Sequence, residues 1–392
     1  MNRPLNILTL STLFPNGSSP SFGIFVERQT AELASRPETR VTVINPVGIP
    51  VWPLSRHKQY QPLRALPAHE TWHGLDVYRP RFRLIPKIGG ASNPQRIANA
   101  ILPLAKKQHR QMPFDVIDAE FFYPDGPAAM RLAEALDIPF TIKARGADIH
   151  HWSSDPACRD QILQAAEKAS RLLAVSEALK QDMVALGMEE SRIAVHYTGL
   201  DQERFVPVDR AAAKRALGVE GPLLISTGAL ISRKNQDLVI RALTSLPDAV
   251  LMLAGRGEAE QRYRSLASEL GVADRVRFLG SVAHDELAQL TAAADIAILV
   301  SKSEGLANAW VEALACGTPV IISEAGGARE LVTSPDAGRI VDQTVEAIVE
   351  AAKAVLADPP EQEAVRSSVS RFSWKANGDQ LLAILRQAAT KS

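Results

Sequence analysis

Two glutamates in one stretch of the chain have the spacing and surroundings of a ligand site. Glu304 lies in the polar loop 301–308, and Glu312 follows eight positions later, early in a helix predicted over 309–316. Carboxylates accept hydrogen bonds from sugar hydroxyls, and the free amides at the start of a helix attract phosphate. A ligand that carries both sugar hydroxyls and phosphate would therefore fit this stretch.

The same two glutamates also have a purely structural interpretation. An acid early in a helix is favoured by the helix dipole, and an acid in a loop can simply be solvated. Gly305, beside Glu304, would let the backbone approach a ligand closely, but a glycine is also common in turns. Local residues alone leave both interpretations open, because a fold does not determine a function.

The elements around the loop are predicted from short apolar runs. Residues 296–300 and 320–322 are rich in β-branched side chains, as is typical of strands buried on both faces of a parallel sheet. Asn308 is a good N-cap, and Gly317 with Pro319 ends the helix. The loop therefore lies beyond the carboxyl end of a strand, where open α/β sheets bind ligands.

A second loop adds positive charge. Residues 228–235 follow an apolar run at 223–227 and precede another predicted helix. Arg233 and Lys234 stand directly before that helix, so their cations and its amides would converge on one anion. The simpler alternative is that both are exposed loop charges.

Together these motifs resemble a known family. Glu304 and Glu312, followed by Ala-Leu-Ala-Cys-Gly-Thr-Pro-Val at 313–320, resemble the signature of the retaining glycosyltransferases of family 4. The resemblance implies the GT-B fold, an α/β architecture in which the parallel sheets of two Rossmann-like domains face a central cleft. Residues 228–235 resemble the family pattern Gly-Arg-Leu-x-x-x-Lys-Gly, with Ala229 in place of the arginine.

The resemblance also implies roles for individual residues. A sugar would move from a nucleotide-diphosphate sugar to an acceptor hydroxyl with retention of configuration. Lys234, helped by Arg233 in place of the missing arginine, would neutralise the leaving diphosphate, and Glu304 would orient the sugar. Glu312 would bind the ribose. The donor-binding set is Gly23, Gly228, Phe278, Gly305, Leu306, Ala307, Asn308 and Glu312. In this family the departing phosphate takes the acceptor proton, so no side chain is assigned as a base.

The first half of the chain resembles the acceptor side of the family. Gly23 matches the glycine of a loop that faces the donor, and Arg145 to Asp148 resemble a His-Gly-x-Asp loop in which Arg145 replaces the histidine. We therefore place Arg145 and Asp148 on the acceptor side. With the segment 122–126, this loop resembles a subgroup named for teichuronic acid synthesis, which implies surface polysaccharide biosynthesis and a lipid-linked saccharide as acceptor.

Length and strand–helix alternation predict two α/β domains. The 392 residues divide into an N-terminal domain over 1–205, completed by a C-terminal helix over 376–392, and a nucleotide-sugar domain over 206–375. The proline-rich stretch 49–90 is predicted to be an irregular insertion. Two cysteines, Cys158 and Cys316, cannot form a disulfide framework, so a reducing cytoplasm is expected.

Charge and motif content exclude some partners and favour others. Lys+Arg and Asp+Glu both number 44, so no overall field favours nucleic acid. We find no Asp-x-Asp motif and expect neither a metal nor another cofactor. Residues 50–110, however, hold eleven basic and two acidic residues, a net charge of +9. This stretch is either a solvated face or a surface for peripheral contact with the inner side of the membrane.

Two other functions are compatible with such a fold. One is a nucleotide-sugar epimerase, which would need acid and base side chains in the cleft and no acceptor. The other is a non-catalytic protein that binds nucleotide sugars. Glu304, Glu312 and Lys234 argue against both, and analysis of the products would separate the three.

Overall fold

The computed structural model describes residues 3–86 and 89–390 and contains two compact units. Unit 1 comprises Met1–Gly199 together with Trp374–Ser392, and unit 2 comprises Leu200–Ser373. The boundaries thus fall at 199/200 and 373/374, where the sequence predicts 205/206 and 375/376. In the part of the chain that the structure describes, no helix is both long enough and apolar enough to cross a bilayer.

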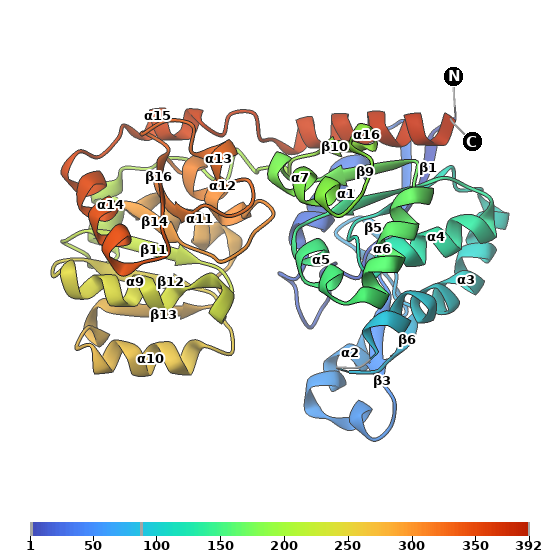
Figure 1. Ribbon diagram of the computed structural model, residues 1–392, viewed down its shortest axis with the longest axis horizontal. Helices are drawn as coiled ribbons and strands as arrows, with labels where there is room; N and C mark the ends of the chain where they lie inside the picture. Colours follow the sequence, from blue (N-terminus) through green and yellow to red (C-terminus); the bar gives the residue numbers. More distant parts are fainter. Residues whose placement is uncertain (1–2, 87–88, 391–392) are drawn as a thin grey trace. The chain divides into compact units, whose positions relative to one another are not determined.

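Unit 2 is built on a six-stranded sheet in which all strands are parallel (Figure 1). Its order is β13-β12-β11-β14-β15-β16. The strands are β11 (Leu223–Thr227), β12 (Val250–Ala254), β13 (Val276–Gly280), β14 (Ile296–Leu299), β15 (Val320–Ser323) and β16 (Gly338–Val341). Reading the strands by their order in the chain gives 3-2-1-4-5-6, the order of the Rossmann fold.

Helices cover both faces of this sheet because alternate strand residues point to opposite sides. Leu224 and Leu251 pack with helices α9, α10 and α14, whereas Ile225 and Met252 pack with α8 and α11. The bounds are α8 (Arg210–Ala216), α9 (Gln236–Ala242), α10 (Glu260–Glu269), α11 (His284–Ala293), α12 (Asn308–Ala315), α13 (Ala328–Leu331), α14 (Val345–Ala357) and α15 (Gln362–Ser367). The strands are therefore buried on both faces, which explains their continuous apolar runs.

Strand order in unit 2 determines which loops meet. Strands β11 and β14 are neighbours although they lie far apart in the chain. From this pair the order runs outward in opposite directions, so the sheet reverses its strand order between β11 and β14. Open α/β sheets bind their ligands at this topological switch point.

Unit 1 contains an eight-stranded sheet with a similar core order (Figure 1). Its order is β10-β9-β8-β7-β1-β2-β5-β4, and the switch point lies between β1 and β7. The strands are β1 (Leu5–Leu10), β2 (Thr39–Ile44), β4 (His69–Trp72), β5 (Leu75–Tyr78), β7 (Val116–Ala119), β8 (Phe140–Ala144), β9 (Arg171–Ala174) and β10 (Ile193–Val195). Only the edge strand β4 pairs in the antiparallel direction among these described strands.

Helices connect the strands of unit 1 and cover its sheet (Figure 1). Among them are α1 (Ile24–Ala34), α3 (Asn93–Gln111), α4 (Asp125–Leu136), α5 (Ala147–His150), α6 (Pro156–Lys168), α7 (Glu177–Ala185) and α16 (Trp374–Thr390). The C-terminal helix α16 lies on unit 1, where Leu381 and Leu385 are buried with Ile7 and Val116 of the sheet.

The prediction of an irregular insertion over 49–90 is wrong for part of that stretch. Strands β5 and β4 extend the main sheet next to β2, because the alternating pattern Leu-Asp-Val-Tyr buries Leu75 and Val77. The rest projects from unit 1 on a separate pair of parallel strands, β3 (Val47–Pro50) and β6 (Arg81–Leu84). Between them lies the short helix α2 (Gln61–Ala65).

Candidate functional site

The loop after β14 leads into helix α12 and leaves the helix start open. Gly305, Leu306 and Ala307 are buried, whereas Glu304 and Asn308 are partly exposed. The prediction that Asn308 is the N-cap is wrong by one position: Ala307 is the N-cap, and Asn308 is the first helical residue. Since alanine has no side-chain acceptor, no cap hydrogen bond occupies the first amides, which suits an anionic ligand.

The three residues predicted to be catalytic lie together in unit 2. Lys234 Nζ donates to Glu304 Oε1 at 2.5 Å, and Arg233 Nη1 lies 3.5 Å from the same oxygen. Arg233 also donates to the carbonyl oxygen of Ser303. The cations come from the loop after β11 and the carboxylate from the loop after β14, so the group lies at the switch point of the sheet.

Backbone contacts hold the two loops in register. Lys302 N donates to Arg233 O at 2.8 Å, which ties the strand-end loops directly to each other. Asn235 adopts a left-handed conformation, with φ 52°, and its side-chain amide donates to Val300 O at 3.0 Å. Because asparagine tolerates this conformation better than most residues, it can turn the chain into α9 just after Lys234.

Glycines let the backbone come close at the same edge of the sheet. Gly228 has φ 147° and lies beneath the Lys234 side chain, since an added Cβ would be 3.7 Å from Lys234 Cε. A Cβ on Gly255 would lie 1.9 Å from Gly228 O, so the ends of β11 and β12 could not pack this way with larger residues. Gly228 thus allows the positive φ at the point where the chain passes under the lysine.

A second glycine turn supports Glu304 from the other side. Gly327 N donates to Gly305 O at 2.8 Å, and a Cβ on Gly326 would lie 2.3 Å from that same oxygen. The turn 325–327, at the end of β15, therefore packs directly against the backbone of the Glu304 loop.

The other predicted donor residues of unit 2 lie at the same sheet edge but differ in environment. Glu312 is largely buried, and its Oε1 lies 4.0 Å from His284 Nε2, at the start of α11. Phe278 packs its ring against the core under the guanidinium of Arg264, whose Cζ is 4.1 Å from the ring centroid. The Phe278 ring is therefore engaged inside unit 2, whereas His284 is a neighbour of Glu312 that motif analysis did not predict.

In unit 1, Gly23 and Asp148 shape the loops at the carboxyl edge of the sheet. Gly23 is the N-cap of α1, with φ 71°, and a Cβ there would lie 2.5 Å from Leu13 O. Asp148 is fully buried and accepts from the amides of Phe122 at 2.8 Å and of Gly146 at 2.8 Å. Burial raises the pKa of this carboxyl in spite of the amide donors. Its carboxylate holds the loops after β7 and β8 together.

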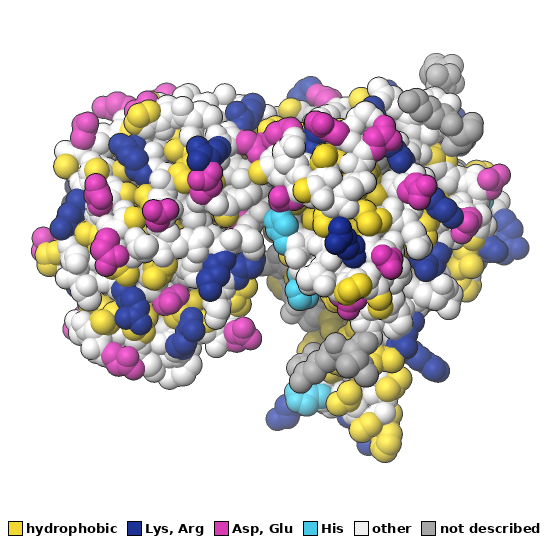
Figure 2. All heavy atoms as spheres, in the orientation of Figure 1, with side chains coloured by type: hydrophobic (Ala, Val, Ile, Leu, Met, Phe, Trp, Pro, Cys, Tyr) yellow, Lys and Arg dark blue, Asp and Glu magenta, His cyan; other side chains and the backbone are white. Residues whose placement is uncertain are grey.

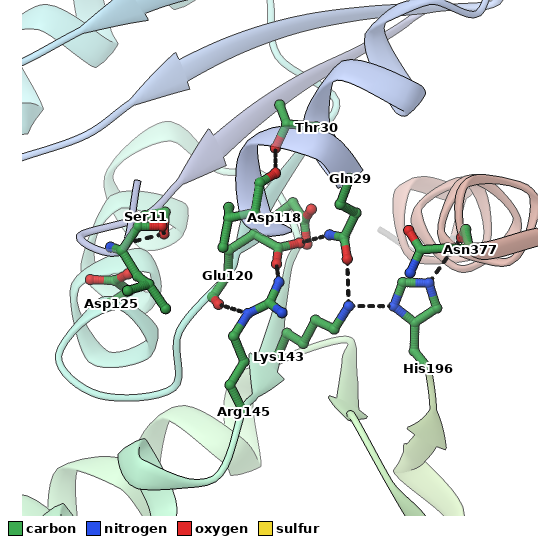
Figure 3. Close-up of polar contacts among 12 residues, drawn as sticks. Ser11, Gln29, Thr30, Asp118, Glu120, Asp125, Lys143, Arg145, His196 and Asn377 are labelled. Carbon is green, nitrogen blue, oxygen red and sulfur yellow. Dashed lines mark hydrogen bonds and ion pairs between the residues drawn. The ribbon is translucent and has the colours of Figure 1, made fainter. Parts of the chain in front are cut away.

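Arg145 lies in a buried ion pair with Glu120, as Figure 3 shows. Its Nε also donates to Glu120 O at 2.8 Å, and its Cζ lies 4.7 Å from the centroid of the Phe25 ring. Burial alone would raise the pKa of Glu120, but the charges of Arg145 and Lys143 lower it. The guanidinium is thus engaged inside unit 1 and fixes the end of β8 against the end of β7.

Motif analysis missed a buried polar network next to this pair (Figure 3). Lys143 Nζ contacts Gln29 Oε1 and lies 2.7 Å from His196 Nδ1, while His196 Nε2 lies 2.9 Å from Asn377 O. A carbonyl can only accept, so Nε2 carries the imidazole proton and Nδ1 accepts from the lysine. Burial and the charge of Arg145 lower the pKa of Lys143. The signal in the sequence was a lysine inside an apolar strand.

The side chains that commonly bind metals do not gather in the part of the chain that the structure describes. In residues 3–86 and 89–390, no group of three or more His, Cys, Asp or Glu side chains has a geometry that could hold a metal ion. Arg233 and Lys234 bring positive charge to Glu304, in the loop that leads into α12.

Two units of Rossmann type, with paired charges at the switch point of the second, define a protein of the GT-B class. Solved structures agree with this fold. Sucrose-phosphate synthase from Thermosynechococcus elongatus matches with a TM-score of 0.82 at 20% identity, covering 99% of this chain and 100% of that one. Anabaena HepE, solved in complex with UDP, matches with a TM-score of 0.74 at 20% identity, covering 98% and 100%.

Sequence comparisons give the family. The model "Glycosyltransferase Family 4" matches residues 26–204, and "Glycosyl transferases group 1" matches residues 208–383. The chain belongs to this family of glycosyltransferases, and the predicted fold class and enzyme class are confirmed.

Two curated relatives show the range of this similarity. A teichuronic acid biosynthesis glycosyltransferase, TuaC of Bacillus subtilis, is 28% identical over 358 residues, 88% of each chain. A GDP-mannose-dependent phosphatidylinositol monomannoside mannosyltransferase of Mycolicibacterium smegmatis is 30% identical over 255 residues, 60% of this chain and 66% of that one.

The glycine turn under Glu304 yields a prediction with a matched control. Gly326→Ala and Gly271→Ala both place a side chain at positive φ, 51° and 67°, and each should lose about 1 kcal/mol of stability from that backbone strain alone. Only Gly326→Ala drives a Cβ into the Glu304 loop, since Gly271 has nothing within 4 Å. Calorimetry should show that affinity for a nucleoside diphosphate falls at least about tenfold in Gly326→Ala alone. Equal affinities in the two variants would contradict this.

Proposed function

We propose that the protein transfers a sugar from a nucleotide-diphosphate sugar to an acceptor hydroxyl with retention of anomeric configuration. The observation that carries the proposal is the meeting of Lys234, Arg233 and Glu304 at the switch point of the unit 2 sheet. When a diphosphate leaves, negative charge develops on its oxygens, and preorganised cations stabilise that charge more than they stabilise the ground state.

The ion pairs with Glu304 hold Lys234 and Arg233 where they can meet the donor. A diphosphate that enters beside Lys234 takes over part of this charge pairing, and Glu304 becomes available to a sugar hydroxyl. Glu312 then binds the ribose, and the amides of Gly305, Leu306, Ala307 and Asn308 contact the donor from the start of α12. Support for a nucleotide ligand comes from the Anabaena neighbour, which was solved with UDP and with UDP-glucose.

We infer further that the acceptor is a lipid-linked saccharide of surface polysaccharide biosynthesis. One relative is described as an enzyme of teichuronic acid biosynthesis and another as one that acts on a phosphatidylinositol mannoside. Arg145, Asp148 and Gly23 order the loops of unit 1 on which such an acceptor would bind. Because the lipid part of the acceptor stays in the bilayer, the cytoplasmic protein would work at the inner face of the membrane.

Product analysis tests this function against its alternatives. Incubation with a panel of nucleotide sugars and a lipid-linked saccharide extract should give a glycosylated product whose anomeric configuration, read by NMR, equals that of the donor. An epimerised free nucleotide sugar, or binding without any product, would favour an epimerase or a non-catalytic binding protein instead.

Lys234→Ala should reduce turnover about 10²- to 10³-fold, because the variant loses a charge that acts on the leaving diphosphate. Lys302→Ala is a matched control, since this lysine is exposed and only its backbone contacts the Arg233 loop. Steady-state kinetics on both variants, with thermal unfolding to check folding, measures the effect. Near-wild-type turnover in a folded Lys234→Ala protein would exclude the proposed role.

Substitutions of the two glutamates should affect different kinetic parameters. Glu312→Ala should raise KM and weaken binding of the free nucleotide diphosphate, because a ribose contact acts equally in the ground and transition states. Glu304→Gln should mainly lower kcat while nucleotide affinity is retained. Calorimetry with the nucleotide diphosphate alone distinguishes the roles, and the reverse pattern would exchange the two assignments.

Transfer should not depend on a divalent cation. Arg233, Lys234 and the amides of α12 supply the positive charge that a metal would otherwise provide. Activity measured in EDTA after exhaustive dialysis should equal activity in buffer with Mg²⁺. Loss of transfer in EDTA that Mg²⁺ or Mn²⁺ restores would show that a metal takes part.

A further inference from the structure

Exposed hydrophobic side chains concentrate at one place in unit 1. Six large hydrophobic residues are strongly exposed among the residues that the structure describes, and three of them lie within four positions: Val51 at 49%, Trp52 at 72% and Leu54 at 53%. They follow β3 directly, in the segment between β3 and β6, and Figure 2 shows hydrophobic side chains gathered on the part of unit 1 that projects from it. An exposed tryptophan flanked by aliphatic residues is costly in water and indicates a contact surface.

The charged side chains of the same segment are all basic. Residues 46–69 contain Arg56, Lys58 and Arg64 and no acidic residue. All three cations are exposed and follow the hydrophobic residues in the chain, Arg56 and Lys58 in single 3-10 turns and Arg64 in α2. We call Val51, Trp52 and Leu54, together with Arg56, Lys58 and Arg64, the docking tip.

Other basic residues of the stretch 50–110 have different roles. Arg79 is fully buried, where it donates to Glu70 at 2.6 Å and to Pro15 O at 2.9 Å. Arg81 donates to Arg79 O at 2.7 Å and to Leu66 O, just after α2. These two arginines fasten the projection to unit 1, so the net charge of the stretch overstates what can face a partner. Arg83, Lys106, Lys107 and Arg110 are also exposed, but they lie outside the segment that carries the exposed hydrophobic side chains.

The docking tip combines the two features that interfacial membrane binding needs. A tryptophan and two aliphatic side chains can enter the boundary between headgroups and acyl chains, and cations beside them meet anionic phosphate groups. An acidic protein surface would satisfy the cations but would leave Trp52 without an apolar partner. A second copy of this chain would bring like charges together.

We propose that the docking tip inserts into the surface of an anionic lipid bilayer and holds unit 1 on the membrane. The inference deepens the proposed function by naming the surface that meets the lipid, and it rests on that function only for the identity of the acceptor. Hydrophobic insertion and charge attraction act together, so binding is reversible and weakens as salt screens the charges.

Vesicle flotation of the full-length protein tests the proposal without donor or acceptor. The protein should float with phosphatidylcholine vesicles that contain phosphatidylglycerol, and not with phosphatidylcholine alone or at high salt. The triple variant Val51→Ser, Trp52→Ser, Leu54→Ser should lose at least about tenfold in partition coefficient, and so should Arg56→Glu with Lys58→Glu. The proposal is overturned if wild type ignores anionic vesicles, or if both variants bind as wild type does.

Matched controls separate the tip from general surface effects. Met112→Ser removes another exposed hydrophobic side chain of unit 1, and Arg215→Glu with Lys353→Glu makes the same charge change on unit 2. Both controls should bind vesicles as wild type does. An equal loss in the charge control and the tip charge variant would mean that overall charge, not the tip, drives binding, and would overturn the proposal.

Tryptophan fluorescence locates the contact. Anionic vesicles should shift the emission of the wild-type protein to shorter wavelength, and Trp52→Phe should abolish the shift while flotation is retained. A shift that persists in Trp52→Phe would place the lipid contact elsewhere. Light scattering measures self-association without lipid. If the wild-type protein associates and the triple variant does not, the tip binds a second copy of the chain instead. Nucleotide-sugar transfer to a soluble acceptor should be normal in all tip variants, so failure here leaves the proposed function standing.

Discussion

The charge arrangement of Lys234, Arg233 and Glu304 depends on a single packing fact, the pairing of β11 with β14. That pairing brings the cationic loop and the acidic loop to adjacent positions at the carboxyl edge of one sheet. Around it, Asn235 turns the chain, Gly228 supplies a positive φ beneath the lysine, and the turn at Gly326 supports the glutamate from the side. These backbone contacts keep the partly buried ion pair in place. The pair could not do so by itself, because an ion pair exposed to water contributes little to the free energy of folding.

Unit 1 has a comparable edge between β1 and β7, but the structure uses charge there differently. Glu120, Lys143 and Arg145 satisfy one another inside the unit, and His196 connects them to Asn377 at the start of α16. Buried charges are costly unless they are paired, so this network ties the C-terminal helix and the loops after β7 and β8 into one arrangement. The acceptor-side loops are therefore held by contacts inside unit 1, which the short motif at 145–148 does not reveal.

Several sequence predictions rested on short-range signals and agree with the structure. Alternating apolar runs and helical segments indicate parallel α/β units, since each strand must be buried on both faces. The glutamate pair and the basic loop belong to continuous motifs that span a few residues each. The N-cap at Asn308 and the irregular stretch 49–90 were less well predicted, because a one-residue shift of a helix start and the joining of β5 to β2 depend on long-range packing.

The sequence by itself therefore determined most elements outside 49–90, the fold class and the family, and it singled out residues with the chemistry for a phosphate and a sugar. Only the tertiary structure decided that Lys234 and Glu304, 70 positions apart, meet in one ion pair, and that Arg145 is engaged with Glu120. It also decided that Arg79 faces inward while Trp52 faces solvent. The physical reason is that strand order and side-chain burial follow from contacts between distant segments, which the local pattern of residues does not specify.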